Sequence, residues 1–443
     1  MSDSEASPAS DAENLPQGPD RVVDSPFNPW RFAKTNASQA VVALAIADIQ
    51  RFEGHHGLRK RTRRQRDQET FELTVEAVLC DLMHHKLRRR PGGIYVTRSN
   101  AVLGHRNRYR PVVYGKTLPD ILDRLAEPEL GWIVQDLGDG DGRYGARRTA
   151  IRPGPELLKQ MGDQDITFTD LARASVAEPI ILKSLKADFW DEAQVTDYSD
   201  TGETTRFRRE MRDINDWLLT ANLDYAIFKG DHAPIPDTTD RALRRIFSRG
   251  DFSCGGRLFG GFWQAIGKAD RFDRLVIDGE AIVELDYAQM GPRQLYGMAG
   301  AVPEMADLYA IPGFEEYRKG IKVVFSSMVF RDEPMRRIPR GSAVLFKNGE
   351  RIGDITEAII GHHPAIAHLF FRGVGHRIQF QESQIMVDIL LRLRSQGMTA
   401  LPIHDAILVA GSNADAARQV MADVFLDHVG LPGLVDVSST PSG

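Results

Sequence analysis

The clearest pattern of hydrophobic and polar positions lies in the second half of the chain, where apolar residues form short runs. Between residues 275 and 285 two such runs flank an Asp-Gly dipeptide, which accepts the positive φ angles of a tight turn and therefore predicts a β-hairpin. The second strand of this hairpin is expected to end on Asp286. Residues 401–409 are apolar except for a central His-Asp pair, which predicts another strand-turn-strand element with Asp405 at its tip.

A different pattern occupies the first half, where apolar residues recur at helical spacing between residues 71 and 83 and again between 118 and 126. Short strands are predicted at 92–96, 131–134 and 147–151. Helices followed by a β-hairpin are the order of a winged-helix domain, in which one helix enters a nucleic-acid groove and the hairpin touches the backbone. Residues 40–160 are therefore predicted to form a winged-helix-like domain, with an ordinary small α+β domain as the alternative.

The N-terminal residues and the middle of the chain carry weaker patterns. Residues 1–26 are rich in Ser, Asp, Glu, Pro and Ala, so too little apolar surface can be buried to offset the entropy of ordering them, and a disordered tail is predicted. Residues 161–249 are predicted to be a helical connector. Their one helical stripe consists of Phe207, Met211, Ile214 and Leu218.

Charge is unevenly distributed along the chain. The 443 residues carry a formal net charge of −5, yet two dense basic runs stand in the predicted N-terminal domain. Such runs are typical of nucleic-acid-binding surfaces, although ordinary solvated faces carry them too. The residues expected to bind nucleic acid are Arg59, Lys60, Arg61, Arg63, Arg64, Arg88, Arg89 and Arg90.

Cysteine content and hydropathy indicate the cellular compartment in which the protein is expected. Cys80 and Cys254 are far apart and form neither a disulfide framework nor a zinc-binding pattern, which favours a reducing, cytoplasmic compartment. No stretch approaches the roughly eighteen consecutive apolar residues of a membrane-spanning helix, so no membrane partner is expected.

Asp286 and Asp405 are the strongest candidates for chemistry, because both are expected at the tips of rigid β elements. Nucleotidyl transfer uses two divalent ions about 3.5–4 Å apart, and Mg²⁺ prefers carboxylate oxygens. A pair of Mg²⁺ ions is therefore the expected cofactor, with Mn²⁺ as a substitute. Glu284 is not expected to be a ligand, because it lies about 7 Å from Asp286 along the same strand.

At these residues the sequence resembles the family A DNA polymerases. Residues 286–293, DYAQMGPR, are similar to the first palm motif of that family, DYSQIELR, and residues 403–406, IHDA, are similar to its HDE motif. Residues 256–258 and 381–383 resemble its TGRLSS and QGTAAD segments. Cations four residues apart at the start of the stretch 318–330 match its fingers helix. The five similar segments occur in the order that the family has.

The resemblance implies a right-hand polymerase palm with compact fingers in residues 250–443, so the expected fold class is α+β, and residues 161–249 would be a reduced thumb. It implies that Asp286 and Asp405 are catalytic. The nucleotide-binding residues that it implies are Arg318, Lys322, Phe330, Gly291 and Tyr287. The additional nucleic-acid-binding residues are Arg257, Gln381 and His404. No set of paired carboxylates upstream marks a proofreading exonuclease.

Three departures from the family concern the choice of sugar. The glutamate that follows HD is Ala406 here, as in single-subunit phage RNA polymerases, where a small residue follows. The glutamate that crowds the sugar 2′ position is Gly291, and the tyrosine at the end of the fingers helix is Phe330. A site with neither the clash nor the hydrogen-bond partner is expected to discriminate weakly between deoxynucleotides and ribonucleotides.

The sequence therefore predicts a template-directed nucleotidyltransferase of the DNA polymerase type. Its partners would be a DNA primer-template, duplex DNA held by the N-terminal domain, and deoxynucleoside or ribonucleoside triphosphates. Compactness and the pairing of domains favour a role in plasmid, phage or other mobile-element replication. One alternative is an RNA polymerase or primase on the same palm, and another is a non-catalytic DNA-binding replication initiator or regulator.

Overall fold

The computed structural model describes residues 24–104, 107–138, 148–174, 178–186, 191–228, 235–347 and 349–439. Contacts divide the chain into two units. The N-terminal unit comprises Gln17–Glu178 and Ile227–Asp240, and the C-terminal unit is formed mainly by Pro179–Ala226 and Arg241–Gly443. The N-terminal unit is therefore discontinuous, because a later segment of the chain returns to it.

The N-terminal unit is built around two long helices, α1 (Asn36–His55) and α2 (Gln65–Leu87). A capping box between Thr35 and Ser38 begins α1, and the buried face of α2 supplies much of the core. The elements that follow α2 are β3 (Ile94–Val96), α3 (Asn100–Gly104), α4 (Leu118–Leu125), β4 (Ile133–Asp136), β5 (Thr149–Pro153) and α5 (Pro155–Asp163). These elements confirm the helices predicted at 71–83 and 118–126 and, within two residues at either end, the three strands.

The sheet of the N-terminal unit has the strand order β1-β3-β5-β4, with β1 formed by Ser25–Pro26. β5 lies between β3 and β4 and is antiparallel to both. A two-stranded ribbon pairs β2 (Arg31–Ala33) with β6 (Leu171–Arg173), which lies beyond the boundary expected at residue 160. The tail predicted for residues 1–26 lies outside the described residues apart from its last three.

A buried polar network fastens the returning segment to this unit. Arg31, which is 3% exposed, donates to Asp81 at 3.1 Å and also pairs closely with Asp237. His84 Nε2 lies 3.1 Å from Asp237 as well. Burial raises the pKa of Asp81 to about 6 and lowers that of His84 to about 4, so the imidazole is neutral at pH 7. The arginine is thus the cation that compensates both carboxylates.

We expect Arg31→Ala to destabilise the protein by about 3–5 kcal/mol, because it leaves two buried carboxylates without their cation. Urea unfolding of the full chain, followed by a signal from the N-terminal unit such as the fluorescence of Trp132, measures this loss. Arg51→Ala is the matched control, since Arg51 forms an exposed pair with Asp48 and should cost less than about 1 kcal/mol. Equal effects of the two substitutions would contradict the buried role of Arg31.

The C-terminal unit contains two sheets. The first has the order β11-β10-β7-β8, and the second has the order β14-β15-β13-β12-β9 with β16 also paired to β13. The strands of the first sheet are β7 (Ile180–Lys183), β8 (Val195–Thr196), β10 (Leu243–Ser248) and β11 (Asp251–Gly260). Those of the second are β9 (Leu223–Tyr225), β12 (Leu275–Ile277), β13 (Glu280–Ala288), β14 (Ala400–Ile403), β15 (Ala406–Ala410) and β16 (Leu434–Ser439).

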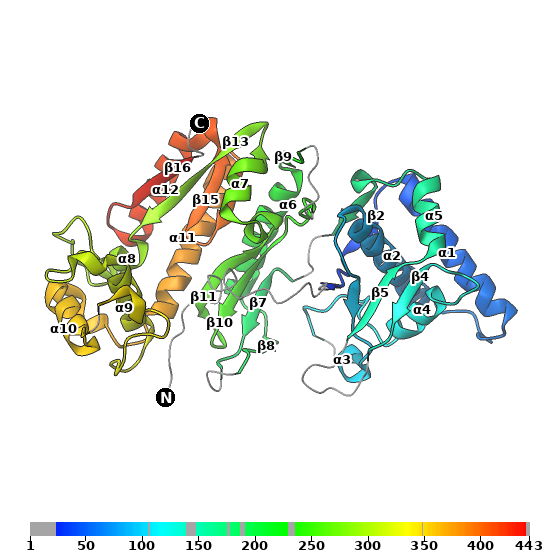
Figure 1. Cartoon of the computed structure of the whole chain (residues 1–443), viewed down its shortest axis with the longest axis horizontal. Helices are drawn as coiled ribbons and strands as arrows, with labels where there is room; N and C mark the ends of the chain where they lie inside the picture. Colours follow the sequence, from blue (N-terminus) through cyan, green and yellow to red (C-terminus); the bar gives the residue numbers. More distant parts are fainter. Residues whose placement is uncertain are drawn as a thin grey trace. The chain divides into compact units, whose positions relative to one another are not determined.

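Helices pack on both sheets of the C-terminal unit (Figure 1). α6 (Gly202–Thr220) and α11 (Gly375–Ser395) contact the first sheet, and α12 (Ala414–Val429) contacts β13, β15 and β16. α8 (Met290–Met298), α9 (Arg318–Phe330) and α10 (Ile352–His362) lie together beside α11 (Figure 1). The short helix α7 (Lys268–Arg274) precedes β12. The whole chain is thus a mixed α and β protein.

Glycines shape β11 in a way that its sequence did not suggest. Residues 251–260 form a ten-residue strand, although glycine is generally depleted in strands. Gly255 and Gly256 have φ angles of +73° and +81°, where the register with β10 shifts. A Cβ on Gly256 would lie 2.7 Å from Ser383 Oγ, so glycine also permits the close approach of α11.

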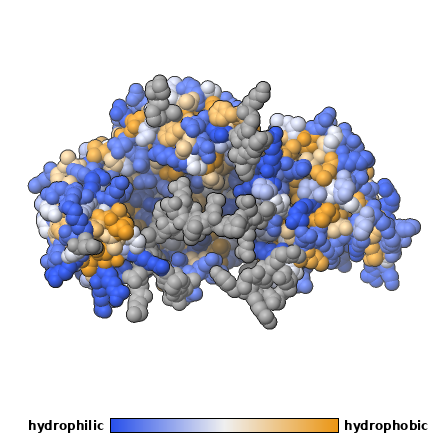
Figure 2. Space-filling model, viewed as in Figure 1, coloured by the Kyte–Doolittle hydropathy of each residue, from blue (hydrophilic) through white to orange (hydrophobic). Residues whose placement is uncertain are grey.

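In the view of Figure 2, hydrophilic residues cover most of the coloured surface, and hydrophobic residues form patches between them. Among the described residues, no helix combines the length and the apolar character needed to cross a membrane.

Candidate active site

The register of the second sheet brings Asp286 and Asp405 together. Strand β13 pairs antiparallel with β15, and Asp286 lies opposite Ala406, the residue that follows Asp405. The turn between β14 and β15 consists of His404 and Asp405, flanked by the pair Ile403 and Ala406, and His404 has a φ of +55°. Both predicted hairpins are therefore confirmed, although β13 continues to Ala288 and Asp286 lies inside the strand rather than at its end.

The electrostatic surroundings of Asp286 favour a bound cation. Burial, Asp405 and Glu284 together raise the pKa of its carboxyl to about 6, although Lys322 and Lys268 oppose the shift. The net upward shift means that the nearby lysines do not compensate Asp286 for its burial and its carboxylate neighbours. A divalent ion would supply the missing positive charge.

Other carboxylates near Asp286 have different roles. Glu284 is 8% exposed and accepts a hydrogen bond from Lys268 Nζ at 2.6 Å. On the other side of β13, the register with β16 puts Asp436 opposite Asp286, a neighbour that sequence reasoning missed because β16 has no strong pattern. Within the described part of the chain, no group of three or more acidic, histidine or cysteine side chains is arranged to hold a metal.

Arg257 is held by a partner that sequence reasoning did not assign to it. Its Nε and Nη2 donate to the same oxygen of Glu382 on α11, at 3.2 and 2.7 Å. Burial raises the pKa of Glu382, and Arg257 opposes this shift. The pKa of His404 is lowered by burial and by Arg257, so His404 is neutral at pH 7. The guanidinium thus lies among Glu382, Asp405 and His404, and a phosphate would have to share it with Glu382.

Helix α9 carries four residues that are four positions apart, and three of them face solvent. Arg318, Lys322 and Ser326 are exposed, and Phe330, at the end of the helix, is partly buried. Arg318 forms two hydrogen bonds to Asp307, from Nε at 2.5 Å and from Nη2 at 3.1 Å. Lys322 lies close enough to Asp286 to oppose the rise in the pKa of that carboxyl.

Two further nucleotide-site candidates differ sharply in their surroundings. Tyr287 is buried, its hydroxyl donates to the carbonyl oxygen of Met421 at 2.6 Å, and its ring packs 5.2 Å from that of Phe425. The structure therefore places Tyr287 in the core against α12 and not at a nucleotide. Gly291 is different, because a Cβ added there would meet no atom within 4 Å.

The remaining candidate residues of the C-terminal unit have structural contacts. Gln381 Nε2 donates to the carbonyl oxygen of His428 at 3.0 Å, and its Oε1 lies 3.4 Å from Gln294 Nε2. The ring of Phe330 lies 5.3 Å from that of His376. Glycine at 375 is required here, since a Cβ would lie 2.5 Å from the Phe330 ring. These contacts fix α11 against α9 and α12.

The basic runs of the N-terminal unit divide into structural and exposed cations. Arg63 pairs with Glu53 at 2.8 Å and stacks 3.7 Å above the Phe71 ring, while Arg59 lies 3.3 Å from the same carboxylate. Arg88 donates to the carbonyl oxygen of Ile235 at 2.6 Å and is largely buried. The exposed members of the two runs are Arg59, Lys60, Arg61, Arg64, Arg89 and Arg90.

Comparisons with known proteins give weak structural likenesses and no sequence match. No family model matches the chain, and no curated protein sequence matches it. A solved structure described as the POL domain of Pol1 from M. smegmatis, in complex with DNA primer-template and dNTP, is similar over 53% of this chain and 51% of that chain, at 11% identity and a TM-score of 0.31. The matched part thus spans about half the length of that structure.

Proposed function

We propose that the protein is a template-directed nucleotidyltransferase of the DNA polymerase type. The observation that carries the proposal is the register of β13 and β15, which sets Asp286 beside Asp405 on rigid strands, with the pKa of Asp286 raised to about 6. Two neighbouring carboxylates that repel one another are suited to binding divalent cations. Primer extension by the purified protein on a primed DNA template, with Mg²⁺ or with EDTA, tests the proposal.

The donor set fits Mg²⁺ or Mn²⁺ better than zinc, since it consists of carboxylate oxygens without thiolate or imidazole. Asp286 and Asp405 would hold the ions, which when bound would activate the attacking oxygen and stabilise the leaving group. Lys268 donates a hydrogen bond to Glu284, and this pairing would keep Glu284 from competing for the same ions.

Cations from α9 would receive the incoming nucleotide. Lys322 acts on Asp286 from this helix, and Arg318 is one turn earlier on the same face. A triphosphate would have to replace Asp307 as the partner of Arg318, because Asp307 accepts both of its hydrogen bonds. Arg257, oriented by Glu382, and His404 would act near the primer end.

The N-terminal unit has the element order of a winged helix. From α2 to β5 the order is helix, strand, helix, helix, strand, strand, and the first strand pairs with the last. Helix α4, in the position of the recognition helix, carries Asp120 and Asp123 and only one cation, Arg124. We therefore assign phosphate binding to the exposed basic run before α2 rather than to α4. Such a DNA-binding unit joined to a compact polymerase suits replication of a plasmid, phage or other mobile element.

The contribution of this run is measurable as a salt dependence. Arg61→Ala/Arg64→Ala should reduce the slope of log K against log [salt] for duplex DNA by about 1.8, since each phosphate contact contributes about 0.9. Fluorescence anisotropy with the full chain at several salt concentrations gives the slope. The control Arg51→Ala/Lys159→Ala removes two exposed cations from α1 and α5 of the same unit and should leave the slope unchanged. Unchanged slopes in both variants would remove the assigned role of the run.

An RNA polymerase or primase is the second candidate, and the open space at Gly291 favours it, because nothing there excludes a 2′-hydroxyl. The choice between the two candidates rests on which triphosphates the protein incorporates.

A further inference from the structure

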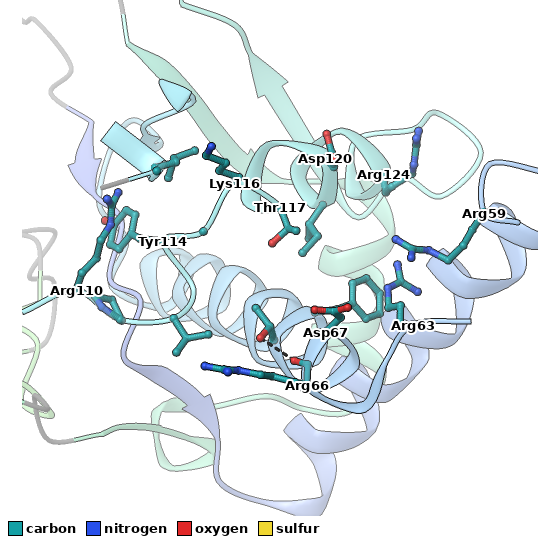
Figure 3. A pocket seen from close by; sticks show the side chains of 18 of the residues that line it. Arg59, Arg63, Arg66, Asp67, Arg110, Tyr114, Lys116, Thr117, Asp120 and Arg124 are labelled. Carbon is teal, nitrogen blue, oxygen red and sulfur yellow. Dashed lines mark hydrogen bonds between the residues drawn. The ribbon is translucent and has the colours of Figure 1, made fainter. Parts of the chain in front are cut away.

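A cavity of about 980 Å³ opens inside the N-terminal unit, between the start of α2, residues 107–117 and α4 (Figure 3). Its volume is within the range of sites that bind a nucleotide-sized molecule. The cationic residues that line it are Arg59, Arg63, Arg66, Arg110, Lys116 and Arg124. Three carboxylates also line it, from Glu53, Asp67 and Asp120. The lining therefore carries a net positive charge.

The cationic side chains of the lining differ in whether they already form ion pairs within the protein. Arg59 and Arg63 share Glu53, and Arg124 Nη1 lies 3.2 Å from Glu127. Arg66 and Lys116 are exposed, and within the described residues no ion pair involves either side chain. They come from opposite walls, one from α2 and the other from the segment before α4 (Figure 3). An anion between these walls can meet cations on both sides.

Part of the lining is apolar. Pro111 and Val112 belong to it, and Val112 is 61% exposed, a high value for a valine at a cavity. Leu103 and Ile121 also belong to it, and both are buried in the core. An inorganic phosphate ion would gain nothing from contact with apolar side chains, whereas a nucleotide presents both an apolar base and charged phosphates. The combination distinguishes the cavity from a surface that only attracts polyanions.

We propose that this cavity is a binding site for a nucleotide with an unesterified terminal phosphate group. Arg66 and Lys116 would bind the phosphate, and the base would lie against Pro111 and Val112. Two sources carry this chemistry, namely a free nucleoside triphosphate and the 5′-phosphorylated end of a strand. The site is separate from Asp286 and Asp405, because all of its lining residues belong to the N-terminal unit.

Three fluorescent probes test the site on the full chain by anisotropy. They are ATP carrying a methylanthraniloyl group on its sugar, a trithymidylate with a 5′-phosphate and a 3′ dye, and the same trithymidylate with a 5′-hydroxyl. EDTA is present throughout, so that the metal-dependent site of the palm does not hold the triphosphate. Arg66→Glu/Lys116→Glu should weaken binding of the ATP probe, the phosphorylated strand or both by at least about tenfold, because two charge-assisted contacts become repulsive.

A control variant separates this site from other cationic surfaces of the same unit. Arg51→Ala/Lys159→Ala removes two exposed cations that do not line the cavity, so this variant should bind the probes as the wild type does. Because Arg66 and Lys116 are exposed, the melting temperature of the double variant should be unchanged. The proposal is overturned if the double variant binds both phosphate-bearing probes as tightly as the wild type. It is also overturned if the 5′-hydroxyl strand binds as tightly as the phosphorylated strand and the ATP probe does not bind.

Discussion

Asp286→Ala or Asp405→Ala should abolish Mg²⁺-dependent primer extension while leaving duplex binding nearly intact. Each aspartate is assigned to hold metal as charge develops in the transition state, and losing that stabilisation costs several kcal/mol, or about a thousandfold or more in rate. Single-turnover extension of a labelled primer measures the rate, and anisotropy with the same duplex measures binding. Synthesis that persists in both variants would mean that the catalytic centre lies elsewhere.

The matched control is Asp278→Asn. Asp278 is an exposed aspartate in the turn between β12 and β13, with a φ of +54° that asparagine tolerates. It should extend primers at the wild-type rate. Asp436→Asn is a more informative comparison, because Asp436 lies opposite Asp286 in β16. A loss intermediate between the control and Asp286→Ala would assign Asp436 a supporting role.

Sugar selection should be weak in the wild type and should change with a single residue. A Cβ added at Gly291 would meet no atom within 4 Å, and Phe330 has no hydroxyl to pair with a ribose. We expect deoxynucleotides and ribonucleotides to be incorporated with efficiencies that differ by less than about a thousandfold, or 4 kcal/mol. Gly291→Glu should shift incorporation toward deoxynucleotides, because the new carboxylate would occupy the space beside the 2′-hydroxyl.

Gly291→Ala is the control for this substitution, since it makes the same backbone change without reaching the sugar. Side-by-side extension with the four deoxynucleotides and the four ribonucleotides, reported as kcat/KM for each, gives the ratio. A strong preference for either sugar in the wild type would show that another side chain makes the selection. No change in the ratio on Gly291→Glu would exclude this position as the gate.

The elements that the sequence predicted best are those in which local chemistry and burial agree. The Asp-Gly turn requires positive φ at both residues, and the apolar strands on either side are buried, so the hairpin of β12 and β13 follows from either signal. The same holds for the turn at His404, although a histidine there is unusual at φ +55°. Helix α4 could be predicted from the sequence just as directly, because its four apolar residues are spaced to lie on one face, and all four are buried.

Other features depend on distant residues and could not be inferred from local pattern. The pairing of Arg257 with Glu382 joins residues 125 positions apart, and neither residue has a signal that names the other. The burial of Tyr287 depends on α12, which supplies the carbonyl oxygen of Met421. Strand β16 is mostly exposed, and its apolar alternation is limited to Val435 and Val437, too short a pattern to identify a strand. Tertiary partners decide all three cases.

The return of residues 235–240 to the N-terminal unit limits how the two units can be separated by recombination or by protein engineering. The chain leaves that unit after Glu178, re-enters it at Ile227 and leaves it again after Asp240. A recombination event with a single breakpoint between the units would separate Asp237 from Arg31 and His84, and both products would begin with an incomplete core. The two units should therefore be exchanged between related proteins as a pair, and a functional graft of the N-terminal unit requires the peptide 227–240 to be supplied with it.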